Sequence, residues 1–198
     1  SSNPSVAQVS VNTVHITGAG TTVITAVQAG NNLYYPAVDV SYTLSVGKAG
    51  QTITFNALPG LIYGDNDVML VAPASSGLNV IFSSANPGVA VVSGATLKVT
   101  GAGSTTITAS QPGNNNFYPA PDAVVNLVVS KAGQEILFTE PDPVVYGSAP
   151  VTAEAFSTSG LPVTFNVSDP SVAAVNGNTI TIKSAGTTMI TARQEGNA

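Results

Sequence analysis

The sequence of 198 residues contains no cysteine and no tryptophan, and it contains a single histidine. Without cysteine the chain can form neither a disulfide nor a thiolate metal site. One histidine leaves little for zinc binding or for nucleophilic catalysis by a Ser-His-Asp set. The sequence therefore predicts a protein that is not an enzyme, with no catalytic residues, no cofactor-binding residues and no cofactor.

Charge is also scarce, because only 8% of the residues are charged and the net charge is -5. The five cations are scattered along the chain: Lys48, Lys98, Lys131, Lys183 and Arg193. They form no basic stripe that would neutralise phosphates, so we expect no nucleic-acid partner. No apolar run approaches the roughly 20 residues needed to span a bilayer, so we expect no membrane insertion by this segment.

The strongest positive feature is internal repetition at steps of 83 residues, as from Lys48 to Lys131. The repeated motifs are KAGQTITF (Lys48) with KAGQEILF (Lys131); NPSVA (Asn3), NPGVA (Asn86) and DPSVA (Asp169); and QAGNNLYYPA (Gln28), QPGNNNFYPA (Gln111) and QEGNA (Gln194). Such self-similarity determines the architecture and is read before any other signal.

Repeat boundaries follow from the stretch LSVGKAGQTI, which has the pattern of a strand end, a short glycine-containing link and a new strand. We therefore predict the C-terminal part of one repeat over 1–47, a complete repeat over 48–130, and a repeat lacking its last strand over 131–198. On this division, we expect the ends of the sequence to mark a cut within a longer protein.

Alternation of apolar and polar residues predicts strands throughout. Val40, Tyr42, Leu44 and Val46 are expected to face inward, as are their counterparts Ala123, Val125, Leu127 and Val129. In the complete repeat the predicted strands are 51–56, 67–74, 78–84, 89–93, 95–100, 104–110 and 123–129. Seven short strands are typical of an immunoglobulin-like sandwich. The predicted fold class is all-β, with tandem immunoglobulin-like β-sandwiches of about seven strands each in an 83-residue repeat array.

The residues KAGQTITF…YGD…SSGL…SSANPGVAVVSG…VTGAGSTTITASQPGNNNFYPA resemble the bacterial immunoglobulin-like repeats of large surface adhesins and gliding-motility-type proteins. The resemblance covers the whole chain. It implies a non-enzymatic structural repeat module of a bacterial cell-surface protein, acting outside the cell as a stalk or adhesive fibre. The partners it implies are neighbouring repeats of the same chain.

Two alternative functions stay open beside this one. One is a carbohydrate-binding module that recognises host or environmental surface glycans. The other is a subunit of an extracellular filament assembled by strand exchange, in which lateral copies of the chain are partners, because a repeat that lacks a strand offers a groove to another chain.

Recurrence separates scaffold residues from candidate sites. The aromatic pairs that recur at the 83-residue step are expected in the cores: Phe55 and Phe138, Phe82 and Phe165, Tyr63 and Tyr146. The glycine and asparagines of the QxGN motif are expected to form a turn. One aromatic side chain after each turn is expected to be partly exposed, and Tyr34 and Phe117 are the candidates for stacking on a sugar ring.

Two further candidates occur once only. Asp65 and Asp67 offer clustered carboxylates of the kind that calcium prefers, but Ser148 and Pro150 replace them in the third repeat. A calcium ion required by every repeat is therefore excluded, and one local ion is left as the candidate. Asn166 begins the sequon Asn-Val-Ser on the outward phase of a predicted strand, which makes it a candidate for glycosylation.

Overall fold

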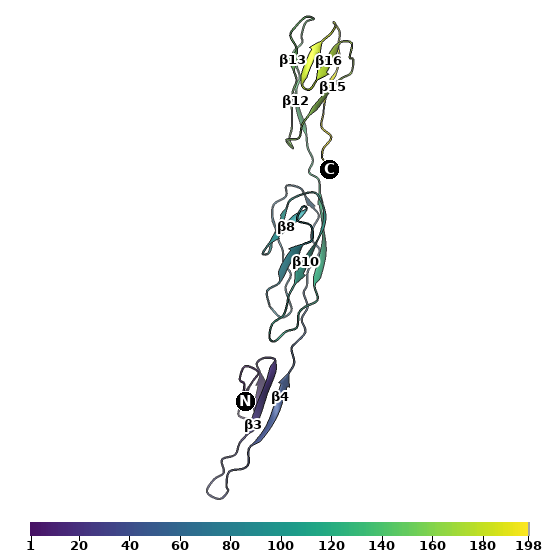
Figure 1. Ribbon diagram of the computed structural model, residues 1–198. Coiled ribbons are helices and arrows are strands. Elements are labelled where there is room, and N and C mark those ends of the chain that lie inside the picture. Colours follow the sequence, from purple (N-terminus) through teal and green to yellow (C-terminus); the bar gives the residue numbers. More distant parts are fainter. Residues whose placement is uncertain (198) are drawn as a thin grey trace. The chain divides into compact units, whose positions relative to one another are not determined.

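The computed structural model describes residues 1–197, and all regular structure within that range is strand. Figure 1 shows the strands of the chain in several short sheets. It divides into two compact units, Ser1–Lys131 and Ala132–Ala198. The first unit holds the first and second repeats, and the second unit holds the third. Within 1–197, no helix is long and apolar enough to cross a membrane.

The strands repeat at the step seen in the sequence. The first repeat contains β1 (Ala7–Ser10), β2 (Thr13–Ile16), β3 (Gly20–Ala26) and β4 (Val40–Val46). The second contains β5 (Leu61–Ile62), β6 (Val68–Met69), β7 (Ile81–Ser84), β8 (Ala90–Ser93), β9 (Thr96–Val99), β10 (Gly103–Ser110) and β11 (Ala123–Ser130). The third contains β12 (Ile136–Thr139), β13 (Val151–Thr152), β14 (Glu154–Ser157), β15 (Thr164–Val167), β16 (Ala173–Asn176), β17 (Thr179–Ile182) and β18 (Ile190–Arg193).

The second repeat is a two-layer sandwich. One sheet has the strand order β5-β11-β10-β7, and the other has the order β6-β9-β8. Strand β11 is antiparallel to β10, with Leu127 opposite Thr105, and parallel to β5, with Val129 opposite Leu61. Seven strands in two facing sheets form the immunoglobulin-like sandwich that the alternation predicted.

The core of the second repeat is built from both sheets. Leu97 of one sheet and Ile107 and Leu127 of the other have no exposed surface. Phe55 and Phe82 pack against this cluster with their ring centroids 5.6 Å apart. In the third repeat the pair Phe138 and Phe165 lies 5.7 Å apart and packs on the equivalent core. The prediction that these recurrent phenylalanines are core residues is confirmed.

The prediction that Tyr63 and Tyr146 are core residues is wrong, because both side chains are exposed. Each tyrosine precedes a glycine with a positive φ angle, 97° at Gly64 and 89° at Gly147. In the second repeat the N–H of Asp65 donates to the carbonyl of Ile62 and closes a turn at this point. The Tyr-Gly pair therefore recurs because it belongs to this turn, and the turn leaves the tyrosine ring exposed to solvent.

The first repeat leaves part of its inner face uncovered. Val40 and Tyr42 of β4 are exposed, Tyr42 by 76%, although the alternation placed them inward. In the second repeat the same face is covered by Phe55 and Phe82, which belong to residues 48–84. Residues 1–47 correspond to 84–130 and contain no counterpart of that cover. Alternation thus identified the face of the strand but not the presence of a covering segment.

Two predicted strands of the second repeat are mostly irregular. Residues 51–56 and 67–74 form β6 and one isolated bridge, between Ile53 and Ala74. In the third repeat the equivalent segments pair as β12 and β14, with Leu137 opposite Phe156. The second repeat has Pro73 where the third has Phe156. Proline cannot donate to a ladder, which explains the interruption.

Candidate functional site

The QxGN motif folds as the predicted turn. The Asn114 Oδ1 accepts the N–H groups of Asn116 at 2.8 Å and Phe117 at 3.0 Å, and Asn31 makes the equivalent bonds in the first repeat. Gly113 has a φ of 76°, and a Cβ there would collide with the carbonyl oxygen of Phe117. Turn geometry therefore requires both the glycine and the first asparagine.

A buried glutamine pair joins this turn to the start of the repeat. Gln51 and Gln111 are each only 6% exposed, and Gln51 Nε2 donates to Gln111 Oε1 at 2.7 Å. The same nitrogen donates to the carbonyl of Tyr118 at 2.7 Å, and Gln111 Nε2 donates to the carbonyl of Asn79 at 3.3 Å. The hydroxyl of Ser76 donates to Gln51 Oε1. The KAGQ and QxGN motifs are thus two halves of one polar contact.

The third repeat contains the same contact. Gln134 Nε2 donates to Gln194 Oε1, and the hydroxyl of Ser157 donates to Gln134 Oε1 at 2.8 Å. Both glutamine pairs are separated by 60 residues. This pairing of the two glutamines was not predicted from the sequence. The available signal was the recurrence of both glutamines at a constant mutual spacing.

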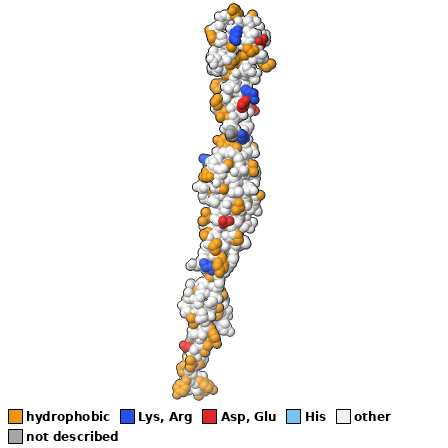
Figure 2. All heavy atoms as spheres, turned by 45° about the vertical axis from the view of Figure 1, so that its right-hand side comes forward, with side chains coloured by type: hydrophobic (Ala, Val, Ile, Leu, Met, Phe, Trp, Pro, Cys, Tyr) orange, Lys and Arg blue, Asp and Glu red, His pale blue; other side chains and the backbone are white. Residues whose placement is uncertain are grey.

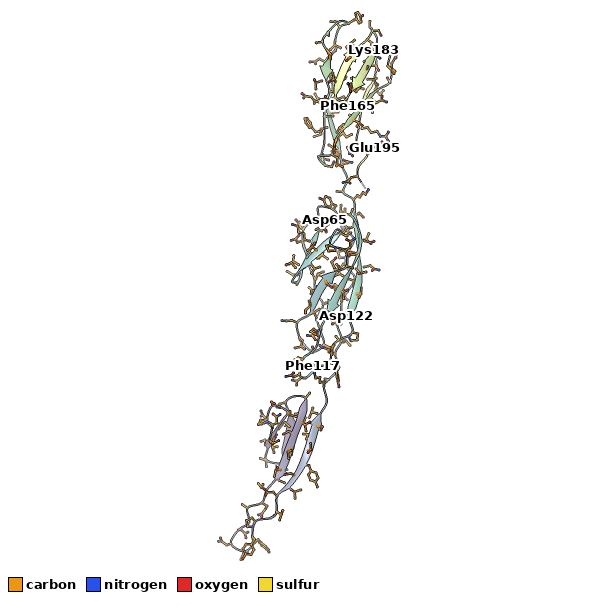
Figure 3. All side chains as sticks on the ribbon, in the orientation of Figure 1. Asp65, Phe117, Asp122, Phe165, Lys183 and Glu195 are labelled. Carbon is orange, nitrogen blue, oxygen red and sulfur yellow. The ribbon has the colours of Figure 1, made fainter. Side chains whose placement is uncertain are left out.

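The two candidate stacking residues differ in access although they are equivalent in the repeat. Tyr34 is 73% exposed. Phe117 is half-buried and forms a parallel bridge with Ala49 of the link between the first and second repeats. Phe117 and Asp65 lie at opposite ends of the second repeat (Figure 3), so the candidate stacking and calcium sites are separate. A role in sugar stacking stays a prediction for both aromatics.

The candidate calcium residues belong to the turn that follows β5. The carboxylate of Asp65 accepts the N–H of Ile62 at 2.8 Å, and Asp67 is exposed. Across residues 1–197 there is no group of three or more His, Cys, Asp or Glu side chains that could hold a metal ion. The Asp65 carboxylate therefore has a structural partner, and calcium binding by this pair stays a prediction.

The candidate glycosylation site lies on an outward face. Asn166 is exposed on β15 opposite Thr191, and its Oδ1 accepts the N–H of Val167 at 2.9 Å. This bond uses the side-chain oxygen and leaves the amide nitrogen, the atom that would carry a glycan, on the exposed strand face. Glycosylation of Asn166 stays a prediction.

One carboxylate has a shifted pKa for a structural reason. The hydroxyl of Ser171 donates to the Asp169 carboxylate at 2.6 Å, and the Ser171 N–H donates to it at 2.9 Å. These bonds favour the ionised form and lower the pKa of Asp169 below its usual value. Asn3 and Asn86 occupy the equivalent turns of the other repeats and accept equivalent bonds. The residue therefore stabilises a turn.

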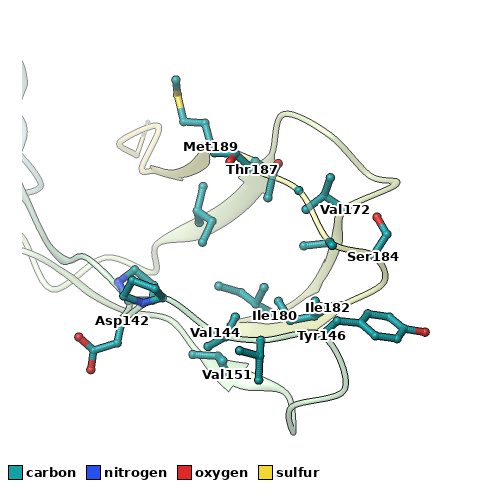
Figure 4. Close-up of a pocket in the computed structure, with 18 of the residues that line it drawn as sticks. Asp142, Val144, Tyr146, Val151, Val172, Ile180, Ile182, Ser184, Thr187 and Met189 are labelled. Atoms are coloured by element: carbon teal, nitrogen blue, oxygen red, sulfur yellow. The ribbon is translucent and has the colours of Figure 1, made fainter.

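An apolar groove of about 1190 Å³ runs through the third repeat. Val144, Val151 and Ile180 line one side, and Thr187 and Met189 lie across from them (Figure 4). Within residues 1–197, β18 forms a ladder only with β15, so the edge of β18 toward the groove has no paired strand. The groove therefore combines an apolar floor with an open strand edge.

In the second repeat the corresponding space is filled by β11. That strand pairs with β10, the counterpart of residues 186–193, and with β5, the counterpart of residues 144–145. Leu61 is 8% exposed beside β11, whereas its counterpart Val144 is 44% exposed beside the groove. Ile107 is fully buried, whereas its counterpart Ile190 is half-buried. The groove thus lies where β11 lies in the second repeat.

No protein-family model matches the chain, and no curated protein matches it. Among solved structures, the chain is similar to Drosophila N-cadherin EC1-4, with a TM-score of 0.34 and 15% identity over 86% of this chain and 52% of that one. It is also similar to domains 1-6 of the surface layer protein SbsC, with a TM-score of 0.35 and 19% identity over 96% of this chain and 27% of that one. The chain spans about half the length of the first structure and about a quarter of the second.

Proposed function

We propose that this chain is a structural segment of a bacterial cell-surface protein, in which the repeats act as a stalk or adhesive fibre outside the cell and perform no catalysis. The observation that carries the proposal is the use of the recurrent residues. The glutamine pair, the phenylalanine pair and the asparagine turn all recur at the 83-residue step, and all make contacts within the scaffold. Selection for such contacts is expected where the scaffold itself is the function.

The surface agrees with this role. Figure 2 shows the few charged side chains dispersed over a surface that is mostly uncharged. Ile81, Val124 and Val128 are exposed on the outer face of the sheet β5-β11-β10-β7. A low-charge face with scattered apolar side chains favours weak lateral association between copies. Stability in such an array is roughly a sum over repeats and their interfaces.

Two measurements on the full chain test the proposal. A compact globule of this length has a radius of gyration of about 16 Å, and small-angle scattering of a spacer array is expected to give a clearly larger value. Antibodies against the chain are expected to label intact cells of the source organism. A radius near the compact value, or labelling only after permeabilisation, would contradict the proposal.

Carbohydrate binding is favoured by one specific feature, the exposed aromatic tip of the first repeat. Tyr34 and its neighbour Tyr35 both present their rings to solvent. Binding on a glycan array is expected to be lost in Tyr34→Ala and largely kept in Phe117→Ala, since the Phe117 ring is partly covered. The absence of binding to any glycan would remove this alternative.

Filament assembly by strand exchange is favoured by the groove of the third repeat. A strand with the pattern of β11, supplied by another copy, would pair antiparallel to β18 and place alternate apolar residues on the groove floor. A peptide with the sequence of residues 121–131 is expected to shift the NMR signals of Val144 and Ile190. A matched peptide with aspartate at the positions of Leu127 and Val129 is the control.

The two outcomes of that experiment separate binding from assembly. Peptide binding together with concentration-dependent growth in light scattering would support a filament subunit. Peptide binding by a chain that stays monomeric would show that the groove accepts a strand but would contradict the filament.

A further inference from the structure

The link between the first and second repeats is held against the QxGN turn of the second repeat. The N–H of Ala49 donates to the carbonyl of Asn116 at 2.8 Å, and the N–H of Tyr118 donates to the carbonyl of Ala49 at 2.9 Å. The ammonium group of Lys48 donates to the carbonyl of Asn114 at 2.8 Å. These three bonds fix the backbone of the turn beside the link.

The same turn reaches the first repeat through one side chain. The N–H of Ala19, in the turn between β2 and β3, donates to Asn116 Oδ1 at 2.9 Å across 97 residues of sequence. A Cβ on the preceding residue, Gly18, would lie 2.9 Å from the same oxygen and 2.6 Å from the carbonyl of Ser5. Glycine at position 18 therefore leaves the space in which the Asn116 amide sits.

We propose that Asn116 sets the geometry of the junction between the first and second repeats by capping the Gly18-Ala19 turn of the first. The interaction surface is the tip of one QxGN turn, and its partner is the exposed backbone N–H of the preceding repeat. For its biological role the inference rests on the proposed function, because a stalk gains reach from junctions of defined geometry. The experiment that tests the inference measures only the contact and the geometry at this junction.

The residue at the position of Asn116 differs between repeats, so a single substitution can change the contact at the junction. Its counterpart in the first repeat is Leu33, which is 85% exposed and has no side-chain acceptor. The backbone bonds of the turn are the same at both positions, since Asn31 and Asn114 organise them equally. The two turns thus present different side chains on the same backbone, and only asparagine can accept the N–H of a preceding repeat.

Preorganisation is the reason to expect a measurable effect from one exposed hydrogen bond. Ala49 already holds the main chain of Asn116, so little freedom remains to be lost when the amide meets Ala19. A neutral hydrogen bond of this kind changes the opening equilibrium of its donor about fivefold.

The test compares Asn116→Ala with Asn115→Ala in the full chain, because Asn115 is the exposed neighbour on the same turn. Hydrogen exchange of the Ala19 amide is expected to become about fivefold faster in Asn116→Ala. Residual dipolar couplings are expected to report a shared alignment of the first and second repeats in the parent chain and divergent alignments in this variant. Asn115→Ala is expected to leave both readouts unchanged, and Asn116→Leu is expected to behave like Asn116→Ala.

Two results would overturn the inference. One is an Ala19 exchange rate and dipolar couplings that do not change in Asn116→Ala while the signals of the second-repeat core stay native. The other is an equal loss in Asn115→Ala, which would assign the effect to the turn as a whole. Neither result bears on whether the chain lies on a cell surface, so failure of the inference and failure of the proposed function are distinguishable.

Discussion

The hydroxyl of Thr105 is buried and accepts the N–H of Asn86 at 2.9 Å. The equivalent bonds, from Asn3 to Thr22 and from Asp169 to Thr188, are also 2.9 Å long. Thr22 of β3 and Thr105 of β10 thus satisfy a backbone donor at the turn that leads into β1 or β8, and Thr188, which lies two residues before β18, does the same at the turn that leads into β16. Alternation alone treats these threonines as polar residues of the outer face, yet Thr22 and Thr105 are among the buried polar residues.

Replacing this hydroxyl by a methyl group is expected to be costly. Thr105→Val keeps the shape of the side chain but leaves the N–H of Asn86 without its acceptor, so the free energy of unfolding of the second repeat is expected to fall by about 1–3 kcal/mol. Urea denaturation measures the change, with Thr54→Val at an exposed position as the control. Equal effects of the two substitutions would contradict this role.

The lowered pKa of Asp169 predicts a pH dependence of stability that is confined to the third repeat. Because its pKa is lowered in the folded chain, the ionised turn contributes stability above the unfolded pKa of about 4. That contribution is lost as the pH falls through the folded pKa. Asp169→Asn, which copies Asn86, is expected to remove this part of the acid sensitivity. Denaturation of the parent chain and of Asp169→Asn between neutral and strongly acidic pH measures this difference in acid sensitivity. Parallel curves of stability against pH for the two proteins would contradict the prediction.

At the scale of elements, the buried glutamines connect the first segment of a repeat to its last turn. Gln51→Leu or Gln111→Leu alone leaves a buried polar partner unsatisfied, whereas the double substitution removes both partners. We therefore expect the double variant to lose less stability than the sum of the single variants, with a coupling of about 0.5–3 kcal/mol. The free energies of unfolding of the parent chain, the two single variants and the double variant give this coupling. Strict additivity would show that the 2.7 Å bond between the side chains contributes nothing.

Five of the strands predicted from sequence in the second repeat are present. Segments 78–84, 89–93, 95–100, 104–110 and 123–129 correspond to β7, β8, β9, β10 and β11. Strand β5 was missed because its two residues, Leu61 and Ile62, are too few to show a period. Pro73 shows the complementary limit, since the predicted strand 67–74 around it is almost continuously apolar but cannot complete a ladder.

The candidate site was predictable only where residue type determines local geometry. Glycine and asparagine in the QxGN motif indicated a turn, and the turn is present. The partners of that turn, Gln51 and Ala19, lie 60 and 97 residues away from the side chains that they contact. The recurrence of both glutamines indicated that they belong to the scaffold. That they bond to each other could be seen only in the folded structure. Asn116 does not recur, and its partner belongs to another repeat.

At the scale of the whole molecule, the described repeats differ in how completely their cores are closed. The buried apolar cluster of the second repeat contains eight residues, and that of the third contains four. Burial of apolar surface is the main stabilising contribution, and the groove leaves Val144 and Ile190 partly exposed. We therefore expect the third repeat to be the less stable of the two in this chain.

This difference predicts stepwise unfolding. Amide exchange followed at increasing urea is expected to show loss of protection in β15 and β18 before β10 and β11, because each repeat has its own core. Addition of the peptide of residues 121–131 is expected to raise the urea concentration of the first transition only. A single transition shared by all four strands would show that the repeats unfold as one unit.

The parallel pairing of the second repeat has a mechanical consequence. Ala49 is bridged in parallel to Phe117, and Leu61 is paired in parallel with Val129, so the entering and leaving segments run side by side in the same direction. The chain enters this pair at Lys48 and leaves it at Lys131, which lie at its opposite ends. Tension on the two ends would slide the segments past each other and strain their hydrogen bonds together in shear, whereas an antiparallel pair pulled from one end opens bond by bond. A repeat connected in this way is expected to resist stretching along its own chain.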